Sequence, residues 1–232
     1  MTREVVLDTE TTGMNPLQGD RIVEIGALEL LNHMPTGRTY HVYLNPDRDM
    51  PDGAFRVHGL SAEFLADKPR FHDIADEFLA FVAEATLVIH NADFDMGFLN
   101  AELGRIGRDP LPMERAVDTV RMARRKYPGA PASLDALCRR FGIDNAHRTL
   151  HGALLDSELL AEVYLQLIGG REPGFRLVGD AGGAGAADDA GAVPVARPDR
   201  APRPHAATAA ELEAHAAFLA RLKDPIWTRG EA

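Results

Sequence analysis

Three apolar, strand-like runs stand in the first 45 residues, and they constrain the fold more than any other feature of this chain. They are residues 4–8, 22–30 and 39–44, each rich in β-branched, Leu or Tyr side chains. Pro and Gly in the segment 35–37 predict a turn between the second and third runs. Three strands in succession predict an antiparallel meander, whose first strand ends at acidic residues.

Helical spacing follows. Apolar side chains recur three and four residues apart over 74–82 and 94–103, and a strand-like run at 87–90 lies between these two segments. The remaining predicted elements are a short strand at 116–118 and helices at 134–141 and 155–167. The succession β-β-β-α-β-α-β-α-α predicts an α/β fold, in which helices flank a mixed sheet.

The composition changes between residues 179 and 206, where Gly, Ala, Pro, Asp and Arg replace nearly all large apolar residues. Such a composition is typical of a flexible linker. A capping-box pattern at 208–211 then begins a helix. We therefore predict three parts: a domain at 1–170, a linker at 171–207, and a terminal helix and tail at 208–232.

The terminal helix has apolar residues along one stripe, and the only Trp of the chain follows it. A lone amphipathic helix of this length is marginally stable in water, so its stripe needs a surface to cover it. We expect a partner protein to supply that surface, with the chain's own domain as the alternative. The expected contact residues are Leu212, Leu219, Leu222 and Trp227.

Charge and cysteine content limit the classes of function. Lys and Arg number 25 against 35 Asp and Glu, which gives a formal net charge of -10. That sign disfavours a broad basic surface for nucleic acid, unless the acidic groups are metal ligands and something else holds the chain on its nucleic acid. The single Cys138, the absence of a signal-peptide pattern and the lack of a membrane-spanning apolar run predict a cytoplasmic protein without a membrane partner.

Paired acidic residues end the first predicted strand and begin a later helix. Asp8 and Glu10 project to the same side of a strand, where two like charges repel unless a cation lies between them. Carboxylate oxygens suit Mg²⁺ or Mn²⁺. An exposed acidic turn is the alternative. Asp93 and Asp95 form the second candidate pair, although either could instead cap the helix.

His151 and Asp156 form the third candidate. Residues five apart do not share a helix face, so we expect His151 to lie on the preceding loop or first turn and to reach over Asp156. Four carboxylates that hold two divalent cations, with a histidine to activate water, fit two-metal phosphoryl transfer. The aspartyl-nucleophile loop of haloacid-dehalogenase-like phosphatases is a weaker alternative, because that family has Asp at the position of Glu10.

Three ordered motifs carry a family resemblance: Asp8-Thr9-Glu10-Thr11-Thr12-Gly13, then residues 90–95, then 151–156. Together they resemble the DEDD exonuclease superfamily, in its histidine branch, over roughly residues 3–167. The resemblance implies a ribonuclease-H-like mixed sheet flanked by helices. It also implies metal ligands at Asp8, Glu10, Asp95 and Asp156, and a general base at His151. The nearby carboxylates would favour the imidazolium, so activity should rise with pH as His151 loses its proton.

The same resemblance implies contacts with substrate. The terminal nucleotide would contact Thr11, His58 and Asn91, in addition to Asp8, Glu10 and Asp156. Gly53 stands where the family often has a glutamate that frames the nucleotide site, so that contact is not carried over.

Within the branch, the segments 6–14, 21–26 and 151–156 are similar to the epsilon proofreading subunits of bacterial DNA polymerase III. This similarity implies a 3′→5′ exonuclease that removes nucleoside 5′-monophosphates from single-stranded or mispaired DNA 3′ ends. It implies that the tail binds the catalytic polymerase subunit, so tethering would replace a basic groove. A sliding clamp and a small accessory subunit are further expected partners, although 171–175 lacks the usual clamp-binding glutamine.

Two alternatives remain at this point. A free-standing exoribonuclease of the same superfamily would use the same metals, and the motifs do not distinguish DNA from RNA. A catalytically silent adaptor would use the fold only for binding.

Overall fold

The computed structural model describes residues 2–146, 148, 150–169 and 206–222. The chain divides into two compact units, residues 1–179 and 180–232. The predicted clamp segment 171–175, most of the predicted linker and Trp227 lie outside the described residues.

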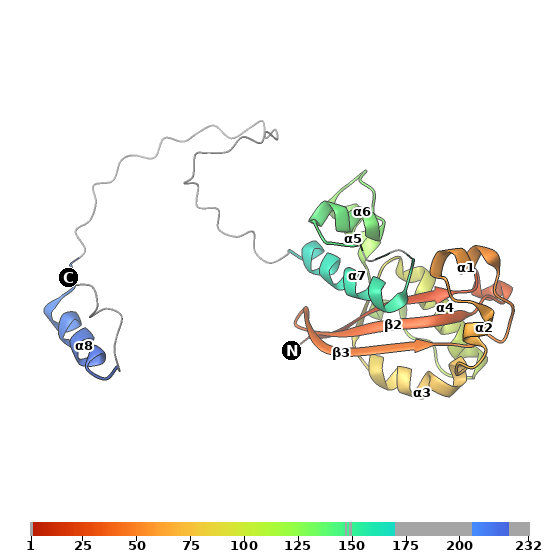
Figure 1. Cartoon of the computed structure of the whole chain (residues 1–232), viewed down its shortest axis with the longest axis horizontal. Coiled ribbons are helices and arrows are strands. Elements are labelled where there is room, and N and C mark those ends of the chain that lie inside the picture. Colours follow the sequence, from red (N-terminus) through yellow and green to blue (C-terminus); the bar gives the residue numbers. More distant parts are fainter. Residues whose placement is uncertain (1, 147, 149, 170–205, 223–232) are drawn as a thin grey trace. The chain divides into compact units, whose positions relative to one another are not determined.

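A five-stranded mixed sheet, in the order β3-β2-β1-β4-β5, forms the centre of the first unit (Figure 1). Its strands are β1 (Arg3–Thr11), β2 (Ile22–Leu31), β3 (Met34–Tyr43), β4 (Thr86–Ile89) and β5 (Ala116–Asp118). The first three strands form an antiparallel meander, while β4 pairs parallel to β1 and β5 pairs parallel to β4. The predicted mixed sheet, including the meander, is confirmed.

The β2–β3 turn differs from the prediction. Asn32 and His33 form the turn with φ of +50° and +65°, and Leu31 pairs directly with Met34. A two-residue hairpin loop needs positive φ at both positions, and Asn accepts this conformation better than most residues do. The turn expected at 35–37 is therefore wrong. Those residues lie in β3, where Gly37 adopts φ +85° beside an irregularity in the strand register.

Helices cover both faces of the sheet. Helices α3 (Phe71–Val82) and α4 (Ala92–Arg105) lie on one face, and α5 (Thr119–Lys126), α6 (Leu134–Phe141) and α7 (Ala153–Leu167) lie on the other (Figure 1). The helices predicted within α3, α4, α6 and α7 are confirmed. Sequence periodicity missed α5 and two short helices, α1 (Asp52–His58) and α2 (Ala62–Leu65). Two 3₁₀ turns, Pro16–Gln18 and Met113–Arg115, complete the elements of this unit.

Alternation along β1 sets the direction of the acidic side chains. Val5 and Leu7 pack among the residues of α3 and α4, whereas Val6 packs among those of α6 and α7. Because side chains alternate across a strand, Asp8 and Glu10 share the face of Val6. The strand therefore presents both carboxylates on the side where α7 lies.

The second unit contains one described helix, α8 (Ala209–Leu219). The predicted capping box is confirmed: the Glu211 N–H donates to Thr208 Oγ1 at 3.3 Å, and the Thr208 N–H donates to Glu211 Oε2 at 2.8 Å. The helix ends at Leu219, before Leu222, and the Arg221 and Leu222 N–H groups after it donate in an i→i+3 pattern. In the described part of the chain, no helix is both long and apolar enough to cross a membrane.

Candidate active site

A cavity of about 530 Å³ opens where β1 ends, and several of the predicted site residues line it. Its walls come from β1 and the turn after it, from α1, from the start of α4 and from the loop before α7. The predicted site residues that line it are Asp8, Glu10, Thr11, His58, Asp95 and His151. Side chains from four separate parts of the sequence therefore meet in one concave site, which is the usual setting for a ligand.

The pKa values of Asp8 and Glu10 are strongly raised in this cavity. Burial raises the pKa of Glu10 to about 8, and the charges of Asp156, Glu24 and Asp95 add to the effect. Burial and the charges of Asp95 and Glu10 likewise raise the pKa of Asp8 well above its ordinary value. The Arg148 charge lowers both pKa values but does not offset these effects, so carboxylates held this close favour a bound cation or a bound proton.

The structure separates the roles of Asp93 and Asp95. The Asp95 side chain is buried, and its Oδ1 accepts from the Thr9 N–H at 3.0 Å and from Thr9 Oγ1 at 2.7 Å. Asp93 points to solvent, where it forms an ion pair with Arg121. Neither aspartate caps the helix, because Asn91 occupies the N-cap of α4. Burial raises the pKa of Asp95 to about 7 even though these hydrogen bonds lower it.

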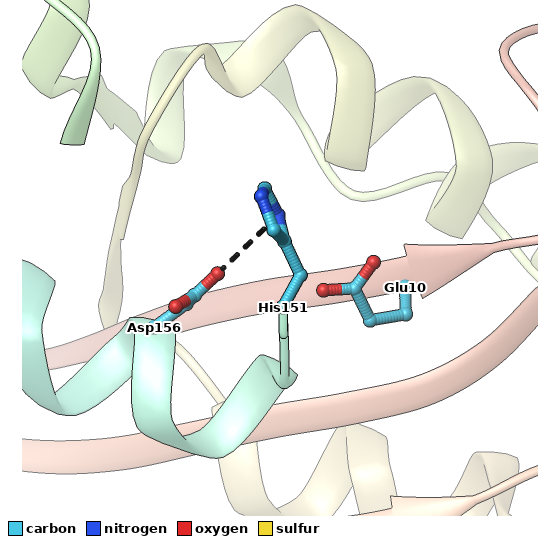
Figure 2. A group of neighbouring side chains, drawn as sticks. All are labelled: Glu10, His151 and Asp156. Atoms are coloured by element: carbon cyan, nitrogen blue, oxygen red, sulfur yellow. Dashed lines mark ion pairs between the residues drawn. The ribbon is translucent and has the colours of Figure 1, made fainter. Parts of the chain in front are cut away.

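His151 and Asp156 meet at the start of α7. His151 lies on the loop two residues before the helix, as expected, and Asp156 lies on its first turn (Figure 2). His151 Nδ1 stands 3.7 Å from Asp156 Oδ2. Ligand atoms of Glu10, His151 and Asp156 all lie within 4.8 Å of one another.

Gly26 lets the start of α7 approach the sheet this closely. It lies on β2 opposite Asp8, and an added Cβ there would stand 2.1 Å from the Leu154 backbone nitrogen. The Ser157 hydroxyl donates to the Gly26 carbonyl at 2.9 Å and fixes the contact. The absence of a side chain at one strand position thus places Asp156 beside Glu10.

The expected protonation of His151 needs a correction. The neighbouring carboxylates do favour the imidazolium, but burial and the Arg148 charge outweigh them and lower the pKa of His151 below its ordinary value. The ring is therefore neutral over more of the pH range than the sequence indicated.

Of the further residues expected to contact substrate, His58 and Thr11 line the cavity and Asn91 is not among its described lining. His58 is buried at the end of α1, and its Nδ1 accepts from the Leu60 N–H at 3.0 Å. The proton of the neutral ring therefore lies on Nε2, which is buried without a hydrogen-bond partner of good geometry among the described residues. Thr11 Oγ1 lies in the cavity wall and donates to the Gly13 carbonyl at 2.6 Å. Asn91 is exposed in the left-handed region, outside the described lining of the cavity.

Sequence reasoning missed two residues of the site. His90 follows β4 and lines the cavity, with Nδ1 2.9 Å from Thr119 Oγ1. Its position at the end of a predicted strand is visible in the sequence, but a lone histidine there indicates no particular role. Arg148 contacts both Asp156 and His151. It stands on a loop, where no periodicity indicates the direction of a side chain, so no sequence signal could have found it.

The residues present fit a divalent cation. Hard oxygen donors from Asp8, Glu10, Asp95 and Asp156 surround the place where β1 ends, and Mg²⁺ and Mn²⁺ prefer such donors. The single positive charge of Arg148 pairs with Asp156, yet the pKa values of Asp8 and Glu10 stay raised, so the cluster keeps uncompensated negative charge. A divalent metal therefore suits the charge of the cluster.

Comparisons with known proteins agree with this geometry. The Exonuclease (RNase_T) family model matches residues 5–164. A curated relative from Rickettsia felis, named DNA polymerase III subunit epsilon, is 56% identical over 179 residues, covering 76% of this chain and 78% of the relative. The protein of the same name from Escherichia coli is 51% identical, covering 74% of this chain and 73% of its own length.

Solved structures support the fold. The nuclease domain of 3′hExo, described as a DEDDh family member bound to rAMP, superposes with a TM-score of 0.62 at 16% identity, covering 72% of this chain and 91% of that domain. The zinc-bound Escherichia coli exonuclease I complex gives 0.65 at 19% identity, covering 75% and 41%. The sheet, the gathered motifs and these relatives lead to one conclusion: the chain belongs to the Exonuclease family and, within it, to the DNA polymerase III epsilon subunits, the 3′→5′ proofreading exonucleases.

Proposed function

We propose that this exonuclease removes nucleoside 5′-monophosphates from frayed or mispaired DNA 3′ ends with the site described above. The observation that carries the proposal is that Asp8, Glu10, Asp95 and His151 line one cavity, and that Asp156 has a ligand atom within 4.8 Å of those of Glu10 and His151. Four of these residues are acidic, and the burial of Asp8, Glu10 and Asp95 raises their pKa values. Such a cluster is suited to hold cations, and phosphodiester hydrolysis uses them.

The four carboxylates would hold two divalent cations, Mg²⁺ or Mn²⁺. When bound, the cations would acidify the attacking water and stabilise charge on the leaving oxygen. Asp8 and Glu10 are fixed by the ladder of β1, and Asp95 is fixed by its two bonds from Thr9. Rigid ligands of this kind keep a site ready for its cation.

His151 would act as the general base that takes a proton from water. A base has to be neutral, and the lowered pKa of His151 supplies the neutral ring near pH 7. The ring lies beside the start of α7 with about half of its side chain exposed, so water reaches it. These two properties match the role.

His58 would hold the terminal nucleotide. Its buried Nε2–H has no partner of good hydrogen-bond geometry among the described residues, and a buried donor without a good acceptor costs free energy. A sugar or phosphate oxygen of the 3′ nucleotide would supply the acceptor. Thr11 lies in the same cavity wall and would also contact the terminal nucleotide. Asn91 would contact this nucleotide from the N-cap of α4.

The C-terminal region would tether the exonuclease to the catalytic polymerase subunit. Three parts are proposed, 1–170, 171–207 and 208–232, with the last part binding the partner. Leu212 is 59% exposed in α8, and Leu222 is exposed after the helix ends, so within the described residues of this unit nothing covers these apolar groups. Phe218, which the predicted apolar stripe did not include, is 55% exposed and belongs with them. Large exposed apolar groups of this kind favour a protein partner.

Degradation of 5′-labelled single strands tests the proposal. Wild type and His151→Ala are compared on a DNA strand and on an RNA strand of the same sequence, with Mg²⁺, with Mn²⁺ and with EDTA. We expect a ladder that shortens from the 3′ end, that is lost in EDTA and in the variant, and that forms faster on DNA. Faster cleavage of RNA would favour the exoribonuclease alternative, and no cleavage of either strand would favour the adaptor.

A further inference from the structure

Arg148 inserts a positive charge among the acidic side chains of the site. Its side chain is 8% exposed, although it carries a full charge. Nε donates to Asp156 Oδ1 at 2.5 Å, and Nη2 donates to Asp156 Oδ2 at 2.7 Å. Nη2 also lies 3.1 Å from His151 Nδ1. One guanidinium thus occupies both oxygens of a proposed metal ligand and one ring nitrogen of the proposed base.

Those contacts conflict with the proposed roles of both residues. A guanidinium stays protonated at any ordinary pH, so Arg148 can leave this position only by moving. While it stays, a divalent cation on the same Asp156 oxygens would be repelled at close range. When His151 Nδ1 accepts from Arg148, the ring proton lies on Nε2, and the neutral ring has no free lone pair for a proton from water.

A second carboxylate, that of Asp135, is an alternative ion-pair partner for Arg148. Nη1 lies 3.1 Å from Asp135 Oδ1, on the first turn of α6. Asn145 Nδ2 donates to the same oxygen at 3.0 Å and orients it. The Asp135 side chain is about half exposed, so a guanidinium that pairs with it alone would stand nearer to solvent. The guanidinium can therefore give up Asp156 and keep one ionic partner.

We propose that Arg148 is a positioning residue that stands in for the divalent cation in the metal-free chain and gives up Asp156 and His151 when the metal binds. This inference rests on the proposed metal-dependent function. Its consequence is a linkage: contacts that stabilise the metal-free site have to be broken during metal binding, so they lower the metal affinity. The same movement frees the lone pair of His151, so the base becomes available only in the loaded site.

Metal titration of the full chain tests this inference. The wild type, Arg148→Gln, Arg148→Lys and the surface control Arg108→Gln are stripped with EDTA, and Mn²⁺ binding is then measured by calorimetry. Arg108 pairs with the exposed Asp76, so its variant removes the same charge away from the site. Thermal unfolding in EDTA and in excess Mn²⁺ gives a second readout that does not depend on nuclease activity.

We expect the Kd of Arg148→Gln for Mn²⁺ to fall about tenfold, which corresponds to about 1.4 kcal/mol. The same variant should unfold at a lower temperature than the wild type in EDTA. Excess Mn²⁺ should raise its Tm by more than it raises the Tm of the wild type. Arg148→Lys keeps the charge but loses the two-pronged contact, so its Kd should lie between those two values. Arg108→Gln should bind Mn²⁺ as the wild type does.

Several results would overturn the inference. If Arg148→Gln binds Mn²⁺ with the wild-type Kd or more weakly, while its stability falls equally with and without metal, Arg148 has only a structural role. Should that variant fail to fold, Arg148→Lys decides, and a Kd equal to or above the wild-type value rejects the inference. If the wild type itself binds no Mn²⁺, the proposed metal function fails, and the role of Arg148 fails with it.

Discussion

Replacement of Glu10 by Gln should stabilise the metal-free chain, although it removes a proposed metal ligand. Burial is the largest cause that raises the pKa of Glu10, from its ordinary 4.5 to about 8. The folded state therefore binds a proton at Glu10 more tightly than the unfolded state does. Ionisation of Glu10 therefore lowers the free energy of unfolding. This loss of stability is absent below the unfolded pKa and grows as the pH rises from 4.5 to 8.

The size of this loss of stability follows from the pKa shift. One pKa unit corresponds to about 1.4 kcal/mol, so the free energy of unfolding should lose about 3 kcal/mol at pH 7 and about 5 kcal/mol above pH 8. Gln keeps the shape and never ionises, but its amide N–H groups also need partners in this buried place. A net gain on the order of 2 kcal/mol near pH 8.5 is the expected result for Glu10→Gln.

Urea unfolding in EDTA measures this gain. The wild type, Glu10→Gln and the control Glu158→Gln are compared near pH 5.5 and near pH 8.5, on either side of most of the Glu10 titration. Glu158 is exposed on α7, so its variant should match the wild type at both values of pH. The reasoning is refuted if Glu10→Gln is less stable than the wild type near pH 8.5, or if its advantage is the same at both values of pH.

Three further predictions concern other parts of the chain. Gly26→Ala would place a Cβ 2.1 Å from the Leu154 backbone, so α7 has to shift. We expect the free energy of unfolding in urea to fall by about 2 kcal/mol or more, together with a steep loss of nuclease activity. Full retention of stability and activity would contradict the close approach. His58→Ala removes the buried Nε2–H, so the KM for a single-stranded DNA end should rise about tenfold or more, whereas an unchanged KM would exclude the contact. The same change also removes the acceptor of the Leu60 N–H and a buried ring, so urea unfolding should show a loss of about 1–3 kcal/mol. Deletion of 208–232 should leave the hydrolysis of short single strands intact and abolish co-elution with the polymerase subunit. Loss of hydrolysis together with co-elution would place the tail within the exonuclease fold.

Local pattern was enough to predict most of the sheet and its larger helices. The apolar run of β1 and the spacing of apolar residues in α3 and α7 record burial directly, because strands and helices bury side chains with different periods. The alternation of β1 is also sufficient to place Asp8 and Glu10 on one face. The β2–β3 turn went wrong because Pro and Gly also occur at strand irregularities, and only the pairing of Leu31 with Met34 shows which role they have.

The proposed site depended on contacts between residues far apart in the chain. Local pattern alone could not separate Asp95 from Asp93, because two residues on one helical turn look alike in sequence. The family resemblance implied Asp95, and the place of Asp95 beside Thr9 gives the physical reason. The protonation of His151 reversed its expected direction because burial and Arg148 act on it together, and neither is written in the motif.

The sequence by itself therefore determined which chemical groups this protein has and the order of the elements that carry them. Only the tertiary structure decided how those groups meet. A missing side chain at Gly26 admits α7 to the sheet, and a loop arginine then enters the space between Asp156 and His151. The physical reason is that electrostatic and steric effects depend on distance in space, whereas sequence patterns record only distance along the chain.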